Sequence, residues 1–595
     1  VDAFFARLIG VVEMVCRRLA LFALLASLSM PAAHADWPMW RADANRGSST
    51  EQALPAELHL QWWKDLGDPQ PAWPATQEKL QFDAGFEPVA AGGRIFVPSM
   101  IHDCLTAYAS DSGDELWRFE ANGPVRFAAT CSGDAVIFGS DDGYVYCVGQ
   151  QDGRLRWKLR GGPSDRQVLG NGRLISTWPV RGAPVVEDGV VYFAAGIWPF
   201  MGVFVRAVDV ESGEVIWTNS GSGSNYLVQP HNSPAFAGVS PQGYLAVTND
   251  AVIVPGGRGV PAGYDKRTGK FLFCHVGNFG KRAGGYDVVT GDHWSCNRGV
   301  FCCAASGAEA ARLKIVAANE EIMLVQSGST LTAYDGQLVS TPATSRDRRG
   351  NEIQFRRFAM KERWQAKLPS GVGKIVLIAG DRAFATDGGD RLSAVTLPKK
   401  EGQPVEISWQ SSVPGNVWNM IAAGDRLLVT TREGGLFCFG SRRRDVERPA
   451  ATQFAVAVED TPSGQLKLIA KGATWKYLDD GSDQKTAWRE VDFDDSAWKQ
   501  GKAELGYGDG DEATTISFGE NGGKKHITSY FRTEFDCDQQ VFDAALLLAK
   551  VDDGAVLYIN GNEVGRLVMP RGEVHFKTPA TDGTKENDFQ RVTVD

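Results

Sequence analysis

Basic, acidic and aromatic side chains gather in the connections between residues 126 and 198. Guanidinium groups present paired donors that match carboxylate and phosphate, and an indole offers a flat face on which a ring can stack. Together they predict a site for a small anionic or sugar-like ligand. The candidate ligand-binding residues are Arg126, Asp141, Asp142, Arg160, Asp165, Arg166, Trp178, Arg181 and Trp198.

The same side chains also have a purely structural explanation. Asp141 and Asp142 precede Gly143, an arrangement typical of tight turns, and the arginines can pair with aspartates on neighbouring sheets. Trp-Pro steps can simply stiffen the connections. Turn formation and ligand binding are therefore both open, and only ligand binding would give this region a function.

Cysteines and histidines give weaker signals for chemistry. Cys302 and Cys303 are adjacent and are candidates for a disulfide with each other, or for ordinary strand cysteines, one of them paired with Cys296. Three histidines near aspartates lack the spacing of metal ligands, so no metal site is predicted. The sequence contains no haem-attachment motif, nucleophile elbow or phosphate-binding loop, so no catalytic residue is assigned.

Repeats of short strands would position these side chains. Residues 132–160 contain three runs rich in β-branched and aromatic residues, separated by Asp142-Gly143 and Asp152-Gly153. Asp-Gly favours type I′ hairpins, in which both central residues take positive φ. With residues 125–130 as an inner strand, one unit is a four-stranded antiparallel sheet ending at Trp157. One such sheet cannot bury both faces, so it must stack on copies of itself.

Copies of this unit recur along the chain. They lie at residues 93–119, 132–160, 188–219, 244–274, 320–368, 380–410 and 424–440, and the outer strands carry structural docking residues Trp117, Trp157, Trp217, Trp364 and Trp409. The last copy lacks an outer strand, and residues 58–66 resemble an outer strand without a unit. An all-β propeller of seven blades, closed by residues 58–66, is therefore predicted. The long interval between Phe273 and Trp364 has room for an eighth blade.

The outer-strand pattern resembles a known repeat family. Ala-x-Asp-x-x-Ser/Thr-Gly-x-x-x-Trp, complete at residues 207–217 and degraded at 107–117, resembles the tryptophan-docking motif of pyrroloquinoline-quinone (PQQ) repeat propellers. The resemblance covers about two thirds of the chain and implies the fold rather than an activity. It also implies that each docking tryptophan packs between adjacent sheets.

The resemblance implies two functions. Some PQQ-like propellers, such as the lipoprotein subunit of the outer-membrane barrel assembly machinery, act through protein contacts without a cofactor. Others are dehydrogenases that hold PQQ and calcium and place a disulfide of adjacent cysteines against the quinone. Cys302-Cys303 comes too late in the repeats for that position, and the calcium ligands and catalytic aspartate have no match. A non-catalytic binding or scaffold protein without cofactor is favoured; a PQQ- and calcium-dependent alcohol or sugar dehydrogenase is the alternative.

The domain organisation follows from shifts in composition. Residues 1–35 resemble a signal peptide, with Met14 as a candidate start, followed by a propeller at 36–447 and a linker at 448–460. Residues 461–595 resemble a galactose-binding-like jelly roll, a β-sandwich that is expected to be truncated and to bind carbohydrate.

These features predict a periplasmic or secreted protein. Its expected partners are envelope or extracellular proteins or glycans. The net charge of −10 argues against bulk nucleic-acid binding. The apolar run of the signal region is too short to span a membrane, so no transmembrane segment is expected after cleavage.

Overall fold

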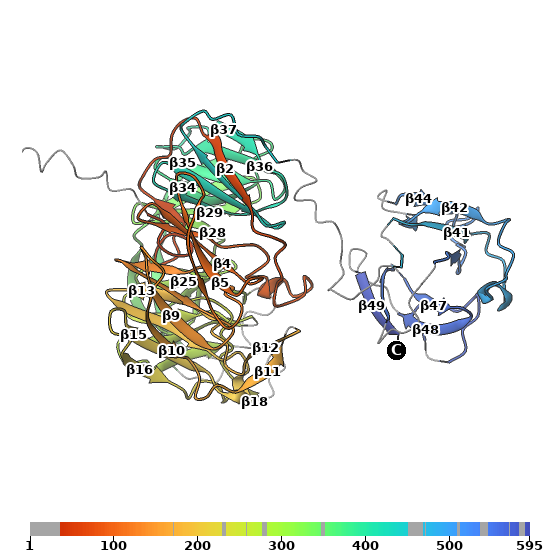
Figure 1. Ribbon diagram of the computed structural model, residues 1–595, viewed down its shortest axis with the longest axis horizontal. Coiled ribbons are helices and arrows are strands. Elements are labelled where there is room, and N and C mark those ends of the chain that lie inside the picture. The colour runs from red at the N-terminus through yellow and green to blue at the C-terminus, as the bar shows by residue number, and fades with distance from the viewer. Residues whose placement is uncertain are drawn as a thin grey trace, which may run out of the picture. The chain divides into compact units, whose positions relative to one another are not determined.

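The computed structural model describes residues 36–170, 172–228, 234–257, 259–275, 283–346, 352–449, 468–469, 472–507, 512–535, 545–551, 553–570, 572–581 and 589–594. The chain divides into two compact units, Val1–Val456 and Ala457–Asp595 (Figure 1). The expected signal peptide at residues 1–35 lies outside the described residues, as does the linker beyond residue 449. No helix in the described part of the chain is long and apolar enough to cross a membrane.

Four-stranded antiparallel sheets, called blades 1 to 8, build the first unit. From inner to outer strand, blade 1 has β3 (Val89–Ala91), β4 (Arg94–Ser99), β5 (Cys104–Ala109) and β6 (Glu115–Glu120), and blade 2 has β7 (Thr130–Ser132), β8 (Ala135–Gly139), β9 (Tyr144–Gly149) and β10 (Leu155–Arg160). Blade 3 has β13 (Gly182–Glu187), β14 (Val190–Ala195), β15 (Phe204–Asp209) and β16 (Val215–Asn219), and blade 4 has β20 (Ala246–Val247), β21 (Ala251–Val254), β22 (Val260–Asp265) and β23 (Phe271–His275).

The remaining blades have the same order. Blade 5 has β24 (Val289–Thr290), β25 (Trp294–Asn297), β26 (Val300–Cys303) and β27 (Glu309–Arg312), and blade 6 has β28 (Ile315–Ala318), β29 (Ile322–Ser327), β30 (Thr330–Asp335) and β33 (Glu362–Lys367). Blade 7 has β34 (Lys374–Ala379), β35 (Arg382–Thr386), β36 (Arg391–Thr396) and β37 (Glu406–Ser412), and blade 8 has β38 (Val417–Ala423), β39 (Arg426–Thr431), β40 (Gly435–Gly440) and β2 (His59–Asp65).

Short elements connect or extend the blades. Strands β1 (Ser49–Thr50) and β19 (Gly243–Tyr244) pair in parallel with β34 and β13. Three hairpins project from the connections: β11 (Gln167–Gly170) with β12 (Arg173–Ser176), β17 (Asn225–Val228) with β18 (Pro234–Ala237), and β31 (Val339–Arg346) with β32 (Glu352–Ala359). Two 3₁₀ turns, η1 (Glu78–Leu80) and η2 (Pro199–Met201), complete the described part of this unit.

The blades form a closed ring. Inner strands of successive blades contact one another from β3 through β7, β13 and β20 to β24, and from β28 through β34 and β38 back to β3. A shared hydrophobic cluster with Val289 and Ala318 joins β24 to β28. The described residues of the first unit therefore form an all-β propeller, in which eight four-stranded sheets replace the favoured number of seven. The additional sheet lies in the interval between Phe273 and Trp364, where the sequence left room for an eighth blade.

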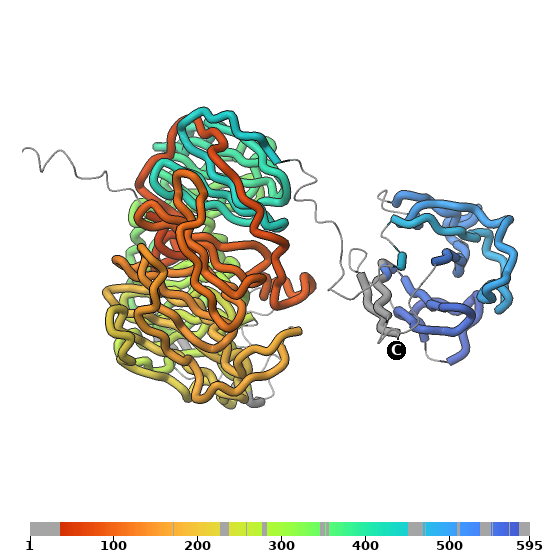
Figure 2. Tube along the Cα trace, in the orientation of Figure 1, coloured from red at the N-terminus to blue at the C-terminus, as the bar shows by residue number. Residues whose placement is uncertain are grey.

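The two ends of the ring meet in blade 8. Strand β2, drawn in red among the teal strands in Figures 1 and 2, pairs antiparallel with β40 through Leu60 with Phe439 and Trp63 with Phe437. Strand β2 lies where the sequence predicts an outer strand, at residues 58–66. The pairing leaves no open sheet edge between the first and last blades.

Glycines form the Asp-Gly turns of blade 2, but not as type I′ turns. Only Gly143 and Gly153 take positive φ, at +90° and +66°. Each aspartate instead accepts a hydrogen bond from the backbone N–H two residues later, at 2.9 Å for Asp142 and 3.1 Å for Asp152. The register shift that follows, between Leu155 and Trp157, fits a bulged hairpin.

Aromatic residues dock most of the outer strands on the next blade. The Trp117 indole N–H donates to Gln150 O at 3.1 Å, the Trp157 indole to Val210 O at 2.9 Å and the Trp217 indole to Lys266 O at 3.0 Å. The Trp409 indole donates to Leu58 O at 3.0 Å, and buried Trp364 packs in a cluster shared with blade 7. Trp62 of β2 completes the set through Ser110 O at 3.0 Å.

Blade 5 departs from this docking pattern. In the other blades the docking aromatic stands opposite a small residue, as Trp117 does opposite Ala107, whereas in blade 5 Ala311 stands opposite Phe301. The Phe301 ring stacks on Trp294, with centroids 5.0 Å apart, and meets Phe358 of the β31–β32 hairpin edge-on at 5.2 Å. In blade 5 the large aromatic side chain is thus on the third strand and the small one on the outer strand. The sequence of this blade therefore lacks the outer-strand aromatic residue by which the other blades were recognised.

The second unit consists of smaller sheets. Its described strands form a three-stranded sheet of β42 (Lys499–Lys502), β41 (Thr474–Leu478) and β45 (Tyr530–Arg532), and pairs of β43 (Leu505–Gly506) with β44 (Thr514–Thr515), β46 (Ala545–Lys550) with β49 (Phe589–Val594) and β47 (Ala555–Ile559) with β48 (Asn562–Leu567); η4 (Ala487–Arg489) is a short turn. Asn560 and Gly561, with φ of +48° and +84°, make the turn of the β47–β48 hairpin. The galactose-binding-like jelly roll stays a prediction for this unit.

We predict that Gly213→Ala lowers the free energy of unfolding far more than Gly189→Ala. Both glycines have nearly equal φ, +74° and +75°, but a Cβ on Gly213 would lie 2.8 Å from the Trp157 ring, whereas a Cβ on Gly189 meets nothing within 4 Å. The backbone change alone costs roughly 1 kcal/mol, and the clash raises the cost at Gly213 to about 3 kcal/mol. Urea unfolding measures both, and equal losses would contradict docking against this ring.

Candidate functional site

The N-terminal residues 36–50, called the plug, pass through the centre of the ring. The Trp37 N–H donates to Ala90 O of β3 at 2.8 Å. Plug carbonyls accept backbone N–H groups of the next inner strands at 2.7 to 3.1 Å. These pairs are Pro38 with Cys131 of β7, Ala44 with Val247 of β20, Asn45 with Thr290 of β24, Gly47 with Ala318 of β28 and Ser48 with Ile378 of β34. The plug therefore ties six of the eight blades to one short segment.

A buried arginine holds the plug in its folded path. Arg46 is 0% exposed and donates to the carbonyl oxygens of Trp40 at 3.0 Å, Leu245 at 2.8 Å and Pro184 of β13 at 3.3 Å. Burial lowers the pKa of Arg46 to about 10, against the attraction of Asp43, so the guanidinium stays charged at neutral pH. The arginine thus adds blade 3 to the blades that the plug contacts.

The backbone of the plug is strained and close-packed. Arg41, Ala42, Arg46 and Ser48 take positive φ of 58°, 78°, 63° and 57°, a conformation that costs roughly 1 kcal/mol for a residue with a side chain. A Cβ on Gly47 would lie 2.3 Å from Ala318 O, so only glycine fits there. Such strain persists because the surrounding strands fix each residue.

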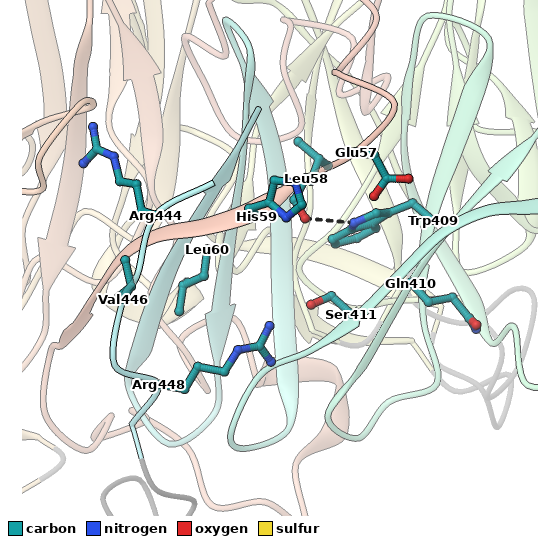
Figure 3. Close-up of a pocket in the computed structure, with 10 residues that line it drawn as sticks. All are labelled: Glu57, Leu58, His59, Leu60, Trp409, Gln410, Ser411, Arg444, Val446 and Arg448. Atoms are coloured by element: carbon teal, nitrogen blue, oxygen red, sulfur yellow. Dashed lines mark hydrogen bonds between the residues drawn. The ribbon is translucent and has the colours of Figure 1, made fainter. Parts of the chain in front are cut away.

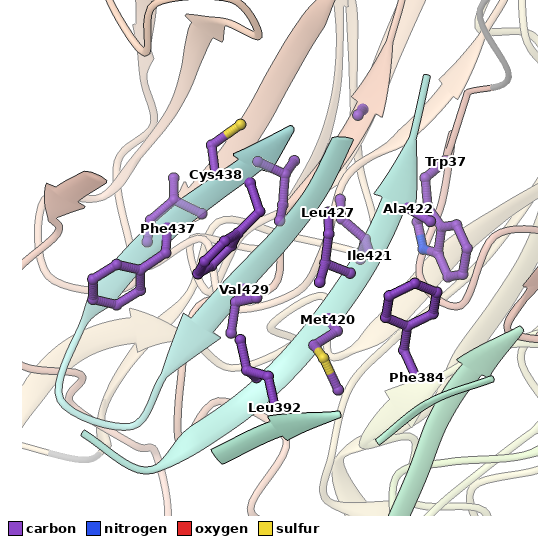
Figure 4. Packing of buried hydrophobic residues seen from close by; sticks show 14 of the residues in the cluster. Trp37, Phe384, Leu392, Met420, Ile421, Ala422, Leu427, Val429, Phe437 and Cys438 are labelled. Carbon is purple, nitrogen blue, oxygen red and sulfur yellow. The ribbon is translucent and has the colours of Figure 1, made fainter. Parts of the chain in front are cut away.

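Two indoles of the plug fill the channel. Trp40 stacks on Tyr244 with centroids 3.9 Å apart and planes 7° apart, and Tyr286 meets it edge-on at 6.5 Å. Trp37 is 1% exposed and belongs to the hydrophobic cluster of blades 7 and 8, near Ala422 and Phe384 (Figure 4). The centre of the ring is therefore occupied by the protein's own side chains.

Three of the predicted ligand-binding residues form a buried ion-pair network. Arg181 donates to both carboxylate oxygens of Asp141 at 2.8 Å, and Arg126 donates to Asp141 at 2.7 Å and to Asp83 at 2.6 Å. Burial raises the pKa of Asp141, but the charges of Arg181 and Arg126 outweigh it and bring the pKa down to about 2. Two arginines and two aspartates thus neutralise each other at this end of blades 1 to 3.

The other predicted residues do not join this network. Asp142 accepts the N–H groups of Asn122 and Tyr144 and the Tyr146 hydroxyl, and is a turn residue. Trp178 is buried and donates to Met201 O at 2.8 Å. Trp198 is half-buried beside η2, and the side chains of three more are exposed: Arg160, Asp165 and Arg166. Asp142 thus makes a turn, and Arg126 and Arg181 pair with Asp141, as the structural alternative of the sequence analysis describes.

The cysteines of the described chain are free thiols. Cys302 and Cys303 are neighbours on β26, so their side chains point to opposite faces of the strand, and the predicted disulfide between them is not formed. Cys302 packs with Val260, Ala283 and Val300. The Cys296 thiol donates to Leu313 O at 3.1 Å and pairs with neither. The described residues contain no group of three or more His, Cys, Asp or Glu that could hold a metal ion.

A buried carboxyl group, that of Glu87, lies close to Trp40 and Arg41 of the plug. Glu87 is 3% exposed and accepts the Trp418 indole N–H at 2.8 Å and the Asn419 amide at 2.5 Å. Burial raises the pKa of Glu87 to about 8, although these hydrogen bonds, one from Trp40 and the charge of Arg41 lower it. Glu87 is therefore largely protonated at neutral pH.

An apolar pair faces solvent on the hairpin β11–β12. Leu169 and Leu174 stand opposite each other and are 73% and 64% exposed, whereas Ile175 on the other face is 1% exposed. Arg173 anchors the hairpin to the connection between β4 and β5, where it donates to Met100 O and pairs with Asp103. Phe200 of η2 is also highly exposed.

A cavity of ≈ 390 Å³ lies between β37, β2 and the segment that leaves blade 8 (Figure 3). Its wall includes His59, Ser411, Arg444 and Arg448, and Arg448 points toward the strand that carries Ser411. The hydrogen bond from the Trp409 indole to Leu58 O crosses the same joint. The cavity is polar and open, and Glu57 supplies a carboxylate beside its basic residues.

Sequence reasoning missed the plug, Asp83 and Glu87. Asp83 and Glu87 follow a proline-rich connection with no repeat pattern, and their partners lie far away in the chain. The plug had a usable signal, because Trp37-Pro-Met-Trp-Arg41 places two tryptophans directly after the expected cleavage site. Aromatic residues that dense are typical of a buried segment.

We predict that Arg46→Met lowers the free energy of unfolding of the ring by about 3 kcal/mol or more. The substitution leaves the carbonyls of Trp40, Leu245 and Pro184 without this donor, and each unpaired buried group costs about 1 to 3 kcal/mol. Arg154→Met, at a side chain 87% exposed, is the matched control. Equal urea midpoints for the two variants would show that Arg46 does not hold the plug.

We predict that Glu87 makes the protein less stable as the pH rises from 4.5 to 8. In this window folded Glu87 keeps its proton, whereas the unfolded side chain, with its ordinary pKa of 4.5, has lost it. As the pH rises through this window, the contribution of Glu87 to the free energy of unfolding falls by up to about 1.4 kcal/mol per pH unit. Melting temperatures across this range should fall less steeply in Glu87→Gln than in the native protein or in exposed Glu120→Gln. Parallel profiles for all three would refute a raised pKa at Glu87.

Part of the chain matches a known protein family. Residues 38–177 match the model of a family described as "Outer membrane protein assembly factor BamB", a stretch that runs from the plug through blades 1 and 2 and the β11–β12 hairpin. No curated protein sequence matches the chain.

The chain is similar at low identity to several solved structures. A europium-containing methanol dehydrogenase is 11% identical with a TM-score of 0.41, covering 68% of this chain and 98% of that chain. BamB from Moraxella catarrhalis is 14% identical with a TM-score of 0.29, covering 59% and 82%. The quinohemoprotein alcohol dehydrogenase ADHIIG from Pseudomonas putida HK5 is 11% identical with a TM-score of 0.43, covering 74% and 83%. The first unit of the chain is an all-β propeller, and its residues 38–177 match the BamB family model.

Proposed function

We propose that this protein is a non-catalytic scaffold that binds another protein through the apolar tip of the β11–β12 hairpin. The observation that carries the proposal is the exposed pair of Leu169 and Leu174 on a hairpin that buries Ile175 on its other face. Burying one leucine side chain contributes about 1.5 to 3 kcal/mol, so a partner with an apolar recess would gain from covering both.

The hairpin is held firmly enough to present this pair. Ile175 packs into the ring, Arg173 pairs with Asp103, and the Thr177 N–H donates to Arg166 O at 2.8 Å. Binding therefore costs little ordering of the hairpin itself. The matched family stretch includes the hairpin, and its description names an assembly factor, which supports a role in protein contacts.

The filled channel argues against the alternative, a dehydrogenase with PQQ and calcium in the ring. A flat quinone in the channel would have to displace Trp40 from its stack on Tyr244. The described residues also bring no three metal-ligating side chains of His, Cys, Asp or Glu together. The residues present do not fit these cofactors in the channel, and no redox step is assigned.

The proposal extends to the place of action and to the second unit. The cell envelope or the extracellular space is the proposed location, reached by means of the signal peptide expected at residues 1–35. The family description, which names an outer-membrane assembly factor, supports an envelope location. The second unit would add contacts to glycans if it binds carbohydrate as its resemblance implies.

Site-specific photo-crosslinking tests the proposal. A photoreactive phenylalanine analogue at position 169, placed in the full chain in cells of the source organism, should capture one defined partner. The same analogue at Val339, an equally exposed apolar residue on the β31–β32 hairpin, should not. The captured protein, once purified, should bind the native chain and bind Leu169→Ser/Leu174→Ser at least about tenfold more weakly.

Two results would contradict the proposal. Equal capture at positions 169 and 339, or unchanged affinity of the double variant for the purified partner, would remove the hairpin from any interface. Dye-linked oxidation of alcohols or sugars by the pure protein with added PQQ and calcium would show that it is an enzyme. Val339→Ser is the control for a general loss of surface apolarity.

A further inference from the structure

A group of cations gathers around Arg41 of the plug at one end of the ring. Lys314 precedes inner strand β28, and Lys374 begins inner strand β34. Arg298 and Arg432 lie in turns between the second and third strands of blades 5 and 8. In an antiparallel blade, the start of the inner strand and that turn lie at the same end. Arg41 of the plug donates to Val316 O of β28 and joins the group from the centre.

Asp287 and Asp43 attract Arg41, and Asp287 attracts Lys374, but no ion pair with a carboxylate is formed within the described residues. Within the described chain none of Arg41, Arg298, Lys314, Lys374 and Arg432 forms an ion pair, and Arg432 lies over the Trp418 ring at 4.6 Å. By contrast, Arg126 and Arg181, which lie at the same end of blades 2 and 3, form buried ion pairs with Asp83 and Asp141. One part of the channel mouth is thus held by ion pairs, and the cations of the other part are not.

The cations are close enough to repel one another. The Lys374 side chain is exposed to solvent, but the protein atoms around it desolvate the ammonium group and lower its pKa. The positive charges of Arg41 and Lys314 lower the pKa further, and the negative charges of Asp287 and Glu87 raise it. Glu87 is largely protonated at neutral pH and therefore balances little of this charge. Two carboxylates, Asp43 and Asp287, attract members of this group of five cations, so the positive charge is compensated in part, and a binding role explains the remainder better than stability does.

A cavity lies beside this group, between blades 5 and 6. Its volume is ≈ 410 Å³, and its wall contains Arg298, Arg312 and Lys314, the neutral polar residues Gln326 and Ser327, and no carboxylate. Arg312 is already paired with Glu309 at 2.7 Å. The Gln326 amide bonds to Gly373 O at 2.9 Å and accepts the Ile375 N–H at 2.9 Å, which links the cavity wall to the backbone on either side of Lys374.

We propose that this cavity binds a small phosphate group, free or carried as an ester, through Arg298 and Lys314. A phosphate carries up to two negative charges near neutral pH and three acceptor oxygens, so it can take donors from both side chains at once. A carboxylate brings one charge and would compensate less of the group. The cavity is far larger than the phosphate alone, and it has room for a small organic part of an ester beside Val300 and Val325.

This inference does not depend on the proposed protein contact. The leucine pair belongs to the β11–β12 hairpin, after blade 2, and the cavity belongs to blades 5 and 6. Leu169→Ser/Leu174→Ser should therefore leave phosphate affinity unchanged, and loss of phosphate binding should leave partner binding unchanged. Failure of one proposal is thus visible without failure of the other.

Isothermal titration of the full chain with inorganic phosphate tests the site. Chloride keeps the ionic strength constant, and glycerol phosphate and acetate are titrated in parallel. The native chain should bind phosphate, and the double variant Arg298→Ala/Lys314→Ala should bind it at least about tenfold more weakly. Arg298→Lys, which keeps the charge but loses the planar fork, should fall between the two. Tighter binding of glycerol phosphate would identify an ester as the preferred source.

The control keeps the number of charges removed the same. Arg442→Ala/Arg443→Ala takes two exposed cations from the segment that leaves blade 8 and should bind phosphate as the native chain does. Both double variants should melt within a few degrees of the native chain, because the altered side chains are exposed. No phosphate binding by the native chain, equal affinity in the two double variants, or binding of acetate as tight as that of phosphate would overturn the inference.

Discussion

Backbone hydrogen bonds between the plug and the inner strands organise the whole ring. A propeller of eight sheets leaves a central channel whose inner strands present N–H groups toward it, and buried groups of that kind need partners. Residues 36–50 supply these partners blade by blade, and Arg46 supplies donors to carbonyls that the plug backbone does not reach. The strained backbone at Arg41 and Ala42 is tolerated because many such bonds hold it.

Filling the centre moves function to the rim. With Trp40 and Trp37 in the channel, ligands and partners are left with the loops at the ends of the blades and the grooves between blades. The charges at one end are divided: the arginines of blades 2 and 3 neutralise aspartates and stabilise the ring, whereas Arg298, Lys314 and Lys374 have no such partner. The same residue types therefore serve two purposes, and only their partners distinguish them.

Local signals made most of the ring predictable, and long-range contacts account for what was missed. Docking tryptophans and turn glycines lie at fixed spacing because each pair must meet across one joint, so blades that carry Trp117, Trp157 and Trp217 are visible in the sequence. Blade 5 was not recognised in the sequence because its outer strand carries the small Ala311 at the docking position, and the aromatic residue, Phe301, is on the third strand. Arg126 and Arg181 were predicted as ligand-binding candidates, and no local pattern indicates that both pair with Asp141, or that Asp83 joins them from a distant connection.

Hydrogen exchange of the plug amides tests the central claim most directly. Peptides that cover residues 37–50 should exchange as slowly as those of the inner strands β13 and β20, since the N–H groups of Trp37, Arg46 and Ser48 are bonded inside the ring. Exchange of these peptides within seconds, as for exposed turns such as residues 188–189, would show that the channel is open and would contradict the account.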